Sequence, residues 1–402
     1  MTKYKTIIAF ASLVQFVNMM DYMMVVPLGP DLAKALPVLN SDVGTICGCY
    51  TLAVAFSGLV LAGVLDRFDR RHVAMAAVAG LGISTLATTF STGFYGLIGT
   101  RVLAGLCGGP AAGIALTMAT EAVPQEHRGK AVAAVMGAFS VSSVVAVPFG
   151  LELARFGNWK SPFYAIFGLA MVVTLGIILF VPPLKEHLAS QKKPVVQEST
   201  FKMVLSMFRE KRKRNALLMM GSSMLSSFLI IPGIAAFFMY NRGFPRADLS
   251  LLYMVGGVVS LILVQLGGWL SDRFGPLSIN FVGTVLLIIF TADGFMHESA
   301  SPLMVIFVMF MAMACMRNVS ATSEAAKVPR QHERAAFMSV LSAVQQAGNG
   351  LGGVISSMVL TSMANGALVG MGTVAGLSIV TALVQPYLLI RLYRRRPYME
   401  RA

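Results

Sequence analysis

The sequence predicts an all-α membrane protein in which twelve transmembrane helices form two pseudo-symmetric bundles of six. Three observations support this prediction: the chain carries little charge, long apolar segments recur along it, and one short charged turn occurs twice. Of the 402 residues, 12% are charged and 56% are hydrophobic, and the mean hydropathy is +0.73. A soluble domain carries about 25% charged residues, so we expect most of this chain to lie in a lipid bilayer.

Apolar segments of membrane-spanning length occur twelve times along the chain. A transmembrane helix needs about 20 mostly apolar residues. Residues 335–390 are uncharged and too long for one span, and we divide them at Asn365-Gly366, which provides a natural turn. The twelve predicted helices cover residues 6–30, 43–65, 73–93, 96–120, 131–153, 161–183, 215–239, 249–271, 277–295, 302–323, 335–363 and 368–390.

A polar linker divides these helices into six and six. Pro182-Pro183 ends the sixth apolar segment, and a basic stretch extends from there to Arg214. We therefore predict an N-terminal six-helix bundle at 1–183, a cytoplasmic linker at 184–214 and a C-terminal six-helix bundle at 215–402.

The basic residues predict how the chain is oriented. The net charge is +14, but the basic residues lie in short gaps between apolar segments, which argues against nucleic acid as a partner. With the N-terminus inside, 25 Lys and Arg residues fall in inner segments and 5 in outer segments. Because basic residues concentrate on the cytoplasmic side, we expect a multi-pass protein of the cell inner membrane with both termini in the cytoplasm. No small-residue cleavage site follows the first apolar segment, so we expect it to be retained as a helix.

The repeated turn indicates a duplication. The first copy, residues 62–71, reads AGVLDRFDRR, and the second, residues 268–275, reads GWLSDRFG. Asp66 and Asp272 are 206 residues apart, close to half of the chain. Each copy ends one apolar segment and precedes another, as expected for two related bundles of helices.

This turn resembles the loop between the second and third helices of the major facilitator superfamily, Gly-x-x-x-Asp-Arg-x-Gly-Arg-Arg. The first copy has Ala62 and Asp69 where the family has glycine, and the second loses the basic pair to Pro276-Leu277. The resemblance spans the chain and implies a secondary transporter.

We interpret the charges of the turn as a conformational gate, because they can bind the polar ends of neighbouring helices. The alternative is ordinary loop charge that follows the orientation rule. The gate residues are Asp66, Arg67, Arg70, Arg71, Asp272 and Arg273.

Further motifs resemble the twelve-helix drug/proton antiporter and sugar-efflux branch of this family. Residues 20–30 resemble the first helix of that branch, and Arg101-Val-Leu-Ala-Gly105 matches an Arg-x-x-x-Gly motif of the fourth helix. In the fifth helix, Gly137 and Val147-Pro148-Phe149-Gly150 resemble the antiporter motif, with Val-Pro in place of the usual Gly-Pro. Gly137, Pro148 and Gly150 are therefore candidates for an antiporter-like helix.

Asp21 is the first candidate for a transport residue. A charged side chain at membrane depth costs about 2.5–3.5 kcal/mol on insertion scales, so it persists mainly where it faces water or a partner. At about 100° per residue, Gln15, Asn18, Asp21 and Tyr22 fall within one arc of about 120° on an otherwise apolar helix. Burial favours the uncharged carboxyl group, which makes protonation of Asp21 near neutral pH possible, whereas a nearby cation such as Arg101 would favour the charged form. The alternative is a structural pair with a cation at the lipid-facing surface or the headgroup level.

Two arginines fall within predicted helices. The family resemblance implies that Arg101 takes part in proton or substrate coupling by forming an ion pair with a carboxylate such as that of Asp21. The alternative is an arginine that snorkels to the outer interface. Arg317 either lines the cavity or pairs with Glu324 at the inner edge.

A second polar stripe, without charge, lies in the predicted helix 335–363. Ser342, Gln345, Gln346 and Asn349 fall within about 100° of the helix surface. Amide side chains hydrogen-bond either a substrate or a neighbouring helix. We favour the substrate cavity for Gln345, Gln346 and Asn349.

The sequence predicts no enzyme, no cofactor and no resident metal. No phosphate-binding glycine loop precedes a lysine, and no helix carries a nucleophile and a base together with a third group that orients them. The four cysteines lie in apolar segments, as is typical of free thiols. Methionine is frequent, at 27 residues, and Met220-x-x-x-Met224 places two soft sulfur ligands on one helical face, as Cu(I) binding would require. We favour ordinary apolar packing for these methionines.

We therefore expect a secondary active transporter that couples efflux of a small organic or drug-like solute to protons. Alternating access would come from rocking one bundle against the other. One alternative is an importer of a small organic solute, a metal or a metal chelate, and another is a transporter-like sensor or scaffold. The expected partners are the substrate, protons and the lipid bilayer, and no oligomeric state is predicted.

Overall fold

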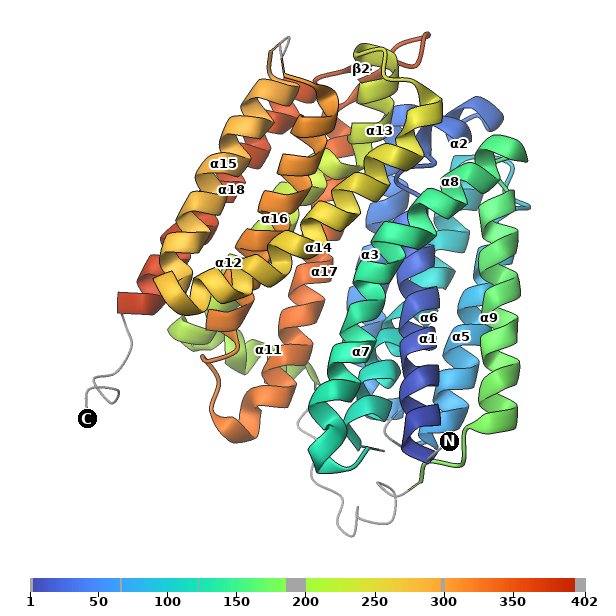
Figure 1. Ribbon diagram of the computed structural model, residues 1–402, viewed down its shortest axis with the longest axis vertical. Helices are drawn as coiled ribbons and strands as arrows, with labels where there is room; N and C mark the ends of the chain where they lie inside the picture. Colours follow the sequence, from blue (N-terminus) through green and yellow to red (C-terminus); the bar gives the residue numbers. More distant parts are fainter. Residues whose placement is uncertain (1–2, 66, 122, 186–199, 298–300, 395–402) are drawn as a thin grey trace.

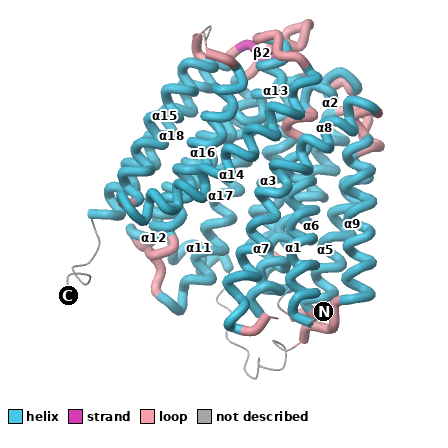
Figure 2. Tube along the Cα trace, viewed as in Figure 1, coloured by secondary structure: helices cyan, strands magenta, loops and turns pink. Residues whose placement is uncertain are grey.

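The protein is seen here in a computed structural model, which describes residues 3–65, 67–121, 123–185, 200–297 and 301–394. It is almost entirely helical, with one short antiparallel pair of strands, β1 (Thr361–Ser362) and β2 (Leu368–Val369) (Figure 2). Long helices run side by side in two groups, blue to green and yellow to red in Figure 1, which is the predicted fold class. The start of α1 and the end of α18 lie at the same end of the molecule, which we call the terminal end; the opposite end is the far end.

The N-terminal helices pack around α1. This helix contacts α6, α7 and α9, while α5 packs against α6 and α9. The bounds are α1 Lys3–Met24, α2 Gly29–Ala35, α3 Val43–Val60, α4 Ala62–Leu65, α5 Arg70–Thr88, α6 Phe94–Glu121, α7 Arg128–Val141, α8 Val147–Phe156 and α9 Ser161–Phe180.

The C-terminal helices form a corresponding group. Helix α12 contacts α17 and α18, and α16 packs against α14 and α15. The bounds are α11 Thr200–Arg209, α12 Lys211–Ile230, α13 Ile234–Ala236, α14 Leu249–Phe274, α15 Pro276–Phe295, α16 Leu303–Ala325, α17 Arg334–Val359 and α18 Met371–Arg394.

Each predicted span corresponds to one helix or to consecutive helical segments. Among the described residues, ten helical segments are long and apolar enough to cross a membrane. Helices α5 and α17 complete the twelve and are more polar, because α5 begins with Arg70-Arg71 and α17 carries its amide side chains. The bundle boundaries remain predictions, since residues 186–199 of the expected linker lie outside the described part.

The predicted helix 131–153 is not a regular α-helix throughout. Helix α7 leads into a π-helical turn at Ser142–Ala146, and α8 continues from Val147. Pro148 lacks an N–H group and its ring crowds the preceding turn, so a regular hydrogen-bond ladder cannot run through it. A wider turn beside it accommodates this break.

The two groups of helices meet closely along α3 and α17. A Cβ atom at Gly48 would lie 2.7 Å from the carbonyl oxygen of Gly350. A Cβ atom at Gly350 would lie 2.9 Å from the carbonyl oxygen of Gly48. A larger side chain would separate the helices, so glycine permits this contact between backbones. A second contact joins α14 to α8 and to the π-helical turn.

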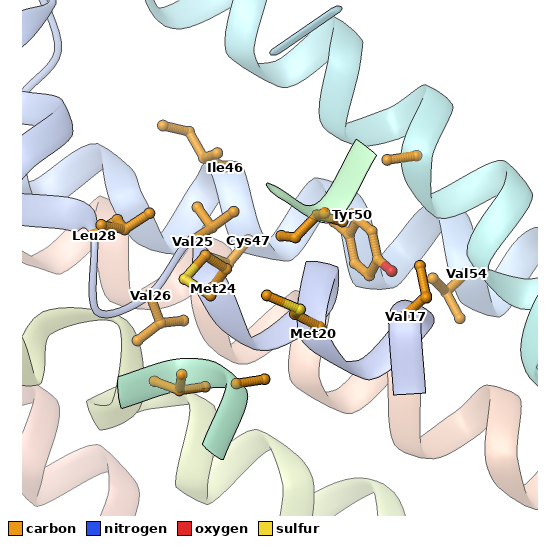
Figure 3. Close-up of a cluster of buried hydrophobic side chains, with 14 of the residues drawn as sticks. Val17, Met20, Met24, Val25, Val26, Leu28, Ile46, Cys47, Tyr50 and Val54 are labelled. Carbon is orange, nitrogen blue, oxygen red and sulfur yellow. The ribbon is translucent and has the colours of Figure 1, made fainter. Parts of the chain in front are cut away.

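Apolar side chains of α1 and α3 pack together inside the protein. Met20 and Met24 of α1 gather with Ile46, Tyr50 and Val54 of α3 in one buried cluster (Figure 3). Polar groups placed beside this cluster lie in a medium of low dielectric constant, where an unpaired charge is costly.

Candidate functional site

A buried ion pair lies inside the N-terminal bundle. Asp21 of α1 and Arg101 of α6 are 0% and 1% exposed, and Arg101 Nη1 lies 3.0 Å from Asp21 Oδ1 and 3.2 Å from Oδ2. Neither side chain lies at a surface. The structure therefore gives Asp21 no lipid-facing partner, and Arg101 does not snorkel to the surface.

Side chains from α3, α5 and α9 complete the surroundings of this pair. The Thr85 hydroxyl donates to Asp21 Oδ1 at 2.7 Å, and Arg101 Nη2 donates to Thr88 Oγ1 at 2.6 Å. The guanidinium lies over the rings of Tyr50 and Phe163, at 6.0 and 5.6 Å from their centroids, and aromatic faces attract a cation. These contacts hold both members of the pair inside the bundle.

A second group of side chains joins the two bundles. Tyr22 of α1 accepts a hydrogen bond from Asn349 Nδ2 of α17 at 3.3 Å, and the same nitrogen lies 3.0 Å from Gln346 Oε1. The Tyr22 ring stacks on the rings of Tyr50 of α3 and Phe228 of α12, with distances between ring centroids of 5.8 Å and 6.3 Å. We call these five residues the interface cluster.

Asn18, from the first predicted polar stripe, lies beside this cluster. Asn18 is 3% exposed and lies beside Tyr50, since a Cβ atom at Gly108 would be 2.9 Å from Asn18 Oδ1 and 2.8 Å from the Tyr50 hydroxyl. Gln15 and Gln345 are half-buried on α1 and α17. The sequence did not indicate that Tyr50 and Phe228 belong to this cluster, because their role depends on the rings that they contact in the folded protein.

Arg317 of α16 makes contacts that the sequence did not predict. It is 0% exposed, its Nε atom donates to Gln385 Oε1 of α18 at 2.8 Å, and Nη2 contacts the same oxygen and the Ala382 carbonyl. The Glu324 carboxylate contacts Lys327 at 2.9 Å. Arg317 thus lies among α15, α16 and α18, where Asn280 of α15 donates to its carbonyl oxygen at 3.1 Å.

The first copy of the repeated turn holds the N-terminal helices together at the terminal end. Asp69 caps α5, accepting from the Arg71 amide at 2.9 Å and from the Leu184 amide at 3.0 Å. Arg70 is 7% exposed, and its Nε atom lies 3.1 Å from Glu121 Oε2 at the end of α6. The guanidinium of Arg71 donates to a carbonyl at the end of α9. These charges therefore bind the ends of neighbouring helices within one bundle.

The other gate candidates have fewer described contacts. Arg67 is exposed, and Asp66 lies outside the described residues. In the second copy, Asp272 is exposed and Arg273 lies over the rings of Trp269 and Phe274. Gly275 adopts a φ of 86°, which favours glycine.

The far end carries polar contacts between the bundles that the sequence did not predict. Arg246 Nε lies 3.1 Å from both carboxylate oxygens of Asp31, and Asn40 Nδ2 donates to the Gly366 carbonyl at 2.7 Å. We call the Asp31–Arg246 pair the far-end latch. Opposite charges in two predicted outer segments were the available signal, but their pairing depends on tertiary packing.

The antiporter-like residues lie along the broken helix. Pro148 is buried just after the π-helical turn, and Gly150 packs directly against Met24 of α1. Gly137 of α7 is half-buried, with open space where a side chain would be. Among the described residues, no three His, Cys, Asp or Glu side chains gather as metal ligands.

Comparison with known proteins identifies the family. The chain matches the family model described as Major Facilitator Superfamily over residues 11–353 and 216–401. The chain belongs to the Major Facilitator Superfamily. Members of this superfamily are membrane transporters.

Individual Major Facilitator Superfamily proteins are similar at low identity. A chloramphenicol resistance protein of Streptomyces lividans is 23% identical over 66% of this chain and 66% of its own length. The purine ribonucleoside efflux pump NepI of Escherichia coli O127:H6 is 24% identical over 60% and 59%. The matched part of the chain thus spans about two thirds of these relatives or less. A D-xylose–proton symporter structure has a TM-score of 0.77 at 16% identity, covering 99% of each chain, which shows the shared fold.

Proposed function

We propose that this transporter exports a small organic solute across the cell inner membrane in exchange for protons. The observation that carries the proposal is the fully buried Asp21–Arg101 pair, in which Arg101 lies over the same Tyr50 ring that stacks on Tyr22 of the interface cluster. A carboxylate that can bind a proton is therefore connected through one ring to side chains from both bundles.

Proton binding at Asp21 would change the charge of this buried group. A proton on Asp21 removes the counter-charge of Arg101 and leaves its guanidinium uncompensated, which costs several kcal/mol in a buried site. A rearrangement of α1 and α6 that gives Arg101 water or another acceptor would relieve this cost. Proton uptake would thereby favour one arrangement of the bundles, as coupled transport requires.

Alternating access would use the contacts at the two ends. The far-end latch and the backbone contact of Gly48 with Gly350 hold the bundles together in the present arrangement. The charges of the first repeated turn bind helix ends within their own bundle. We propose that this is the arrangement closed at the far end, with the terminal end in the cytoplasm because basic residues concentrate there.

The direction of transport rests on the relatives and on the fifth helix. Two of the relatives are described as a chloramphenicol resistance protein and as an efflux pump for purine ribonucleosides, and the buried Pro148 and Gly150 belong to the antiporter-like segment. Both features favour export over import.

Transport by membrane vesicles of opposite orientation tests the proposal. Radiolabelled inosine and chloramphenicol serve as probes, and respiration acidifies the interior of everted vesicles. We expect accumulation in everted vesicles that contain the protein, and its loss when an uncoupler removes the proton gradient. Accumulation in right-side-out vesicles alone would indicate an importer, and binding without accumulation in either orientation would indicate a sensor; both results would contradict the proposal.

A further inference from the structure

Three buried amide oxygens near the bundle interface have no hydrogen-bond partner among the described residues. They are Gln15 Oε1 and Asn18 Oδ1 of α1 and Asn349 Oδ1 of α17. Asn18 and Asn349 are 3% and 4% exposed. Leaving a buried polar atom without a partner costs about 1–3 kcal/mol, so these three atoms on α1 and α17 call for donors that the described residues do not supply.

The hydrogen bonds of the interface cluster fix which atom of Asn349 is unused. Its Nδ2 atom donates to Gln346 Oε1 and to the Tyr22 hydroxyl. The remaining atom is the carbonyl oxygen, which can only accept a hydrogen bond. A ligand that satisfies it must therefore supply an N–H or O–H group.

Flat aromatic surfaces accompany these acceptors. The ring of Tyr22 lies at 26° to that of Tyr50 and at 18° to that of Phe228, so the three rings are stacked nearly parallel. The Phe228 ring belongs to the C-terminal bundle and the other two to the N-terminal bundle. Separation of the bundles would therefore uncover one face of Tyr22 and one of Phe228, between which a flat ring could stack.

The buried charged side chains of the helices already have partners within the protein. Among the described residues, the buried charged side chains away from the helix ends are Asp21, Arg101 and Arg317. Asp21 and Arg101 neutralise each other, and Arg317 is bound to Gln385 among α15, α16 and α18. A charged ligand at the interface cluster, which lies on α1, α3, α12 and α17, would lose its hydration without gaining a counter-charge from Arg317, which disfavours its binding.

We propose that the substrate is an uncharged solute with a flat aromatic or heteroaromatic ring and at least two N–H or O–H donors. The ring stacks on Tyr22 and Phe228, and the donors bind Asn18, Asn349 and Gln15. This inference rests on the proposed transport function, because it names the substrate class for the same interface.

Equilibrium binding to the purified full-length protein, without any ion gradient, tests the substrate class. Inosine and chloramphenicol are uncharged, carry a flat ring and have several donors. Caffeine is uncharged and flat but has no donor, inosine 5′-monophosphate adds negative charge, and ethidium is a flat cation. We expect both donor-bearing neutral probes to bind, and the other three to bind at least tenfold more weakly. Ethidium or the monophosphate binding as tightly as inosine would overturn the proposal, as would failure of both neutral probes to bind.

A selectivity measurement separates recognition from a structural role of Asn349. Asn349→Leu removes one acceptor, so we expect the ratio of inosine to caffeine affinity to fall about tenfold, the equivalent of one lost hydrogen bond at about 1.4 kcal/mol. Thr381→Ala is the control and should keep the ratio, because Thr381 is half-buried on α18 and its hydroxyl bonds backbone carbonyls of its own helix. An unchanged ratio in Asn349→Leu would contradict the role of Asn349. Because binding is measured without a gradient, selective binding combined with absent transport would refute the transport proposal alone.

Discussion

The two arginines buried within the helices of this protein differ in the partner that each one has. Arg101, in the N-terminal bundle, faces the carboxylate of Asp21 at 3.0 Å, whereas Arg317, in the C-terminal bundle, faces the amide oxygen of Gln385 at 2.8 Å. Both arginines are at most 1% exposed. A proton can neutralise the partner of Arg101 but not that of Arg317. One bundle therefore contains a pair whose net charge can change, and the other contains a fixed positive charge.

This difference gives the two halves of a duplicated chain different tasks. The repeated turn relates the halves, yet the position 206 residues after Asp21 is Ser227, which has no carboxylate. In our account the N-terminal bundle responds to protons, while the C-terminal bundle keeps one charge state and contributes Phe228 and Asn349 to the interface. Substitutions at the two arginine sites should therefore have unequal effects.

The largest effect is expected for Arg101→Met. This change leaves Asp21 as a buried carboxylate without its counter-charge, and breaking a buried pair in this way costs about 3–5 kcal/mol. Thermal unfolding of the purified protein measures the loss, which should be accompanied by loss of proton-driven transport. Asp21→Asn should also lower thermal stability, because it leaves the Arg101 guanidinium without a counter-charge. Equal stability of Arg101→Met and the unmodified protein would contradict a structural contribution of the pair.

A smaller effect is expected at Gln385. Gln385→Leu removes the acceptor of Arg317 Nε and Nη2, and leaving those donors unsatisfied costs about 1–3 kcal/mol in unfolding free energy. Gln385→Glu supplies a carboxylate in the same position and should keep or raise thermal stability. Normal transport by Gln385→Glu would strengthen the contrast between the two arginine sites. It would show that the Arg317 site works with a neutral or with a negatively charged partner. Loss of proton coupling in Gln385→Glu would contradict the assignment of proton response to the N-terminal bundle.

The smallest effect on stability is expected at the far-end latch. Asp31 and Arg246 are 20% and 18% exposed, and partly exposed pairs contribute about 1 kcal/mol or less. Asp31→Asn should therefore leave thermal unfolding almost unchanged but let the far end open more often. A cysteine placed at Ser250, beside the contact with Glu152, should react several times faster with a membrane-impermeant thiol reagent.

Asp42→Asn is the matched control for the latch. Its carboxylate accepts from the Leu39 amide of the same bundle at 2.9 Å, so this variant should not change the reactivity of the cysteine. Equal reactivity in Asp31→Asn and Asp42→Asn would show that the latch does not hold the far end closed.

Local hydropathy predicted the helices because lipid imposes a long apolar segment on every span. The predicted segment 96–120 is α6 at Phe94–Glu121, and 302–323 is α16 at Leu303–Ala325. The same reasoning singled out Asp21 and Arg101, since isolated charges stand out within apolar segments. The break at the π-helical turn was less predictable, because Pro148 indicates a disturbed helix but not how the backbone accommodates it.

The partners of buried polar groups could not be read from the sequence. Arg101 lies 80 residues from Asp21, and Gln385 lies 68 residues from Arg317. Which helix faces which at such separations depends on the packing of the whole bundle, and this is why Glu324 was a reasonable but unobserved partner for Arg317. Asp69 illustrates the same limit at short range. Its departure from the family glycine was visible, but its bond to the Leu184 amide requires the folded bundle.

The central claim is that Asp21 carries the proton that drives transport, and Asp21→Asn tests it most directly. Asparagine keeps the shape and an acceptor for Arg101 but cannot titrate. In everted vesicles, the account predicts that this variant still exchanges labelled for unlabelled inosine, while accumulation driven by the proton gradient is lost. Asp248→Asn, an exposed carboxylate at the far end, should accumulate the probe normally. Undiminished gradient-driven accumulation by Asp21→Asn would contradict the account.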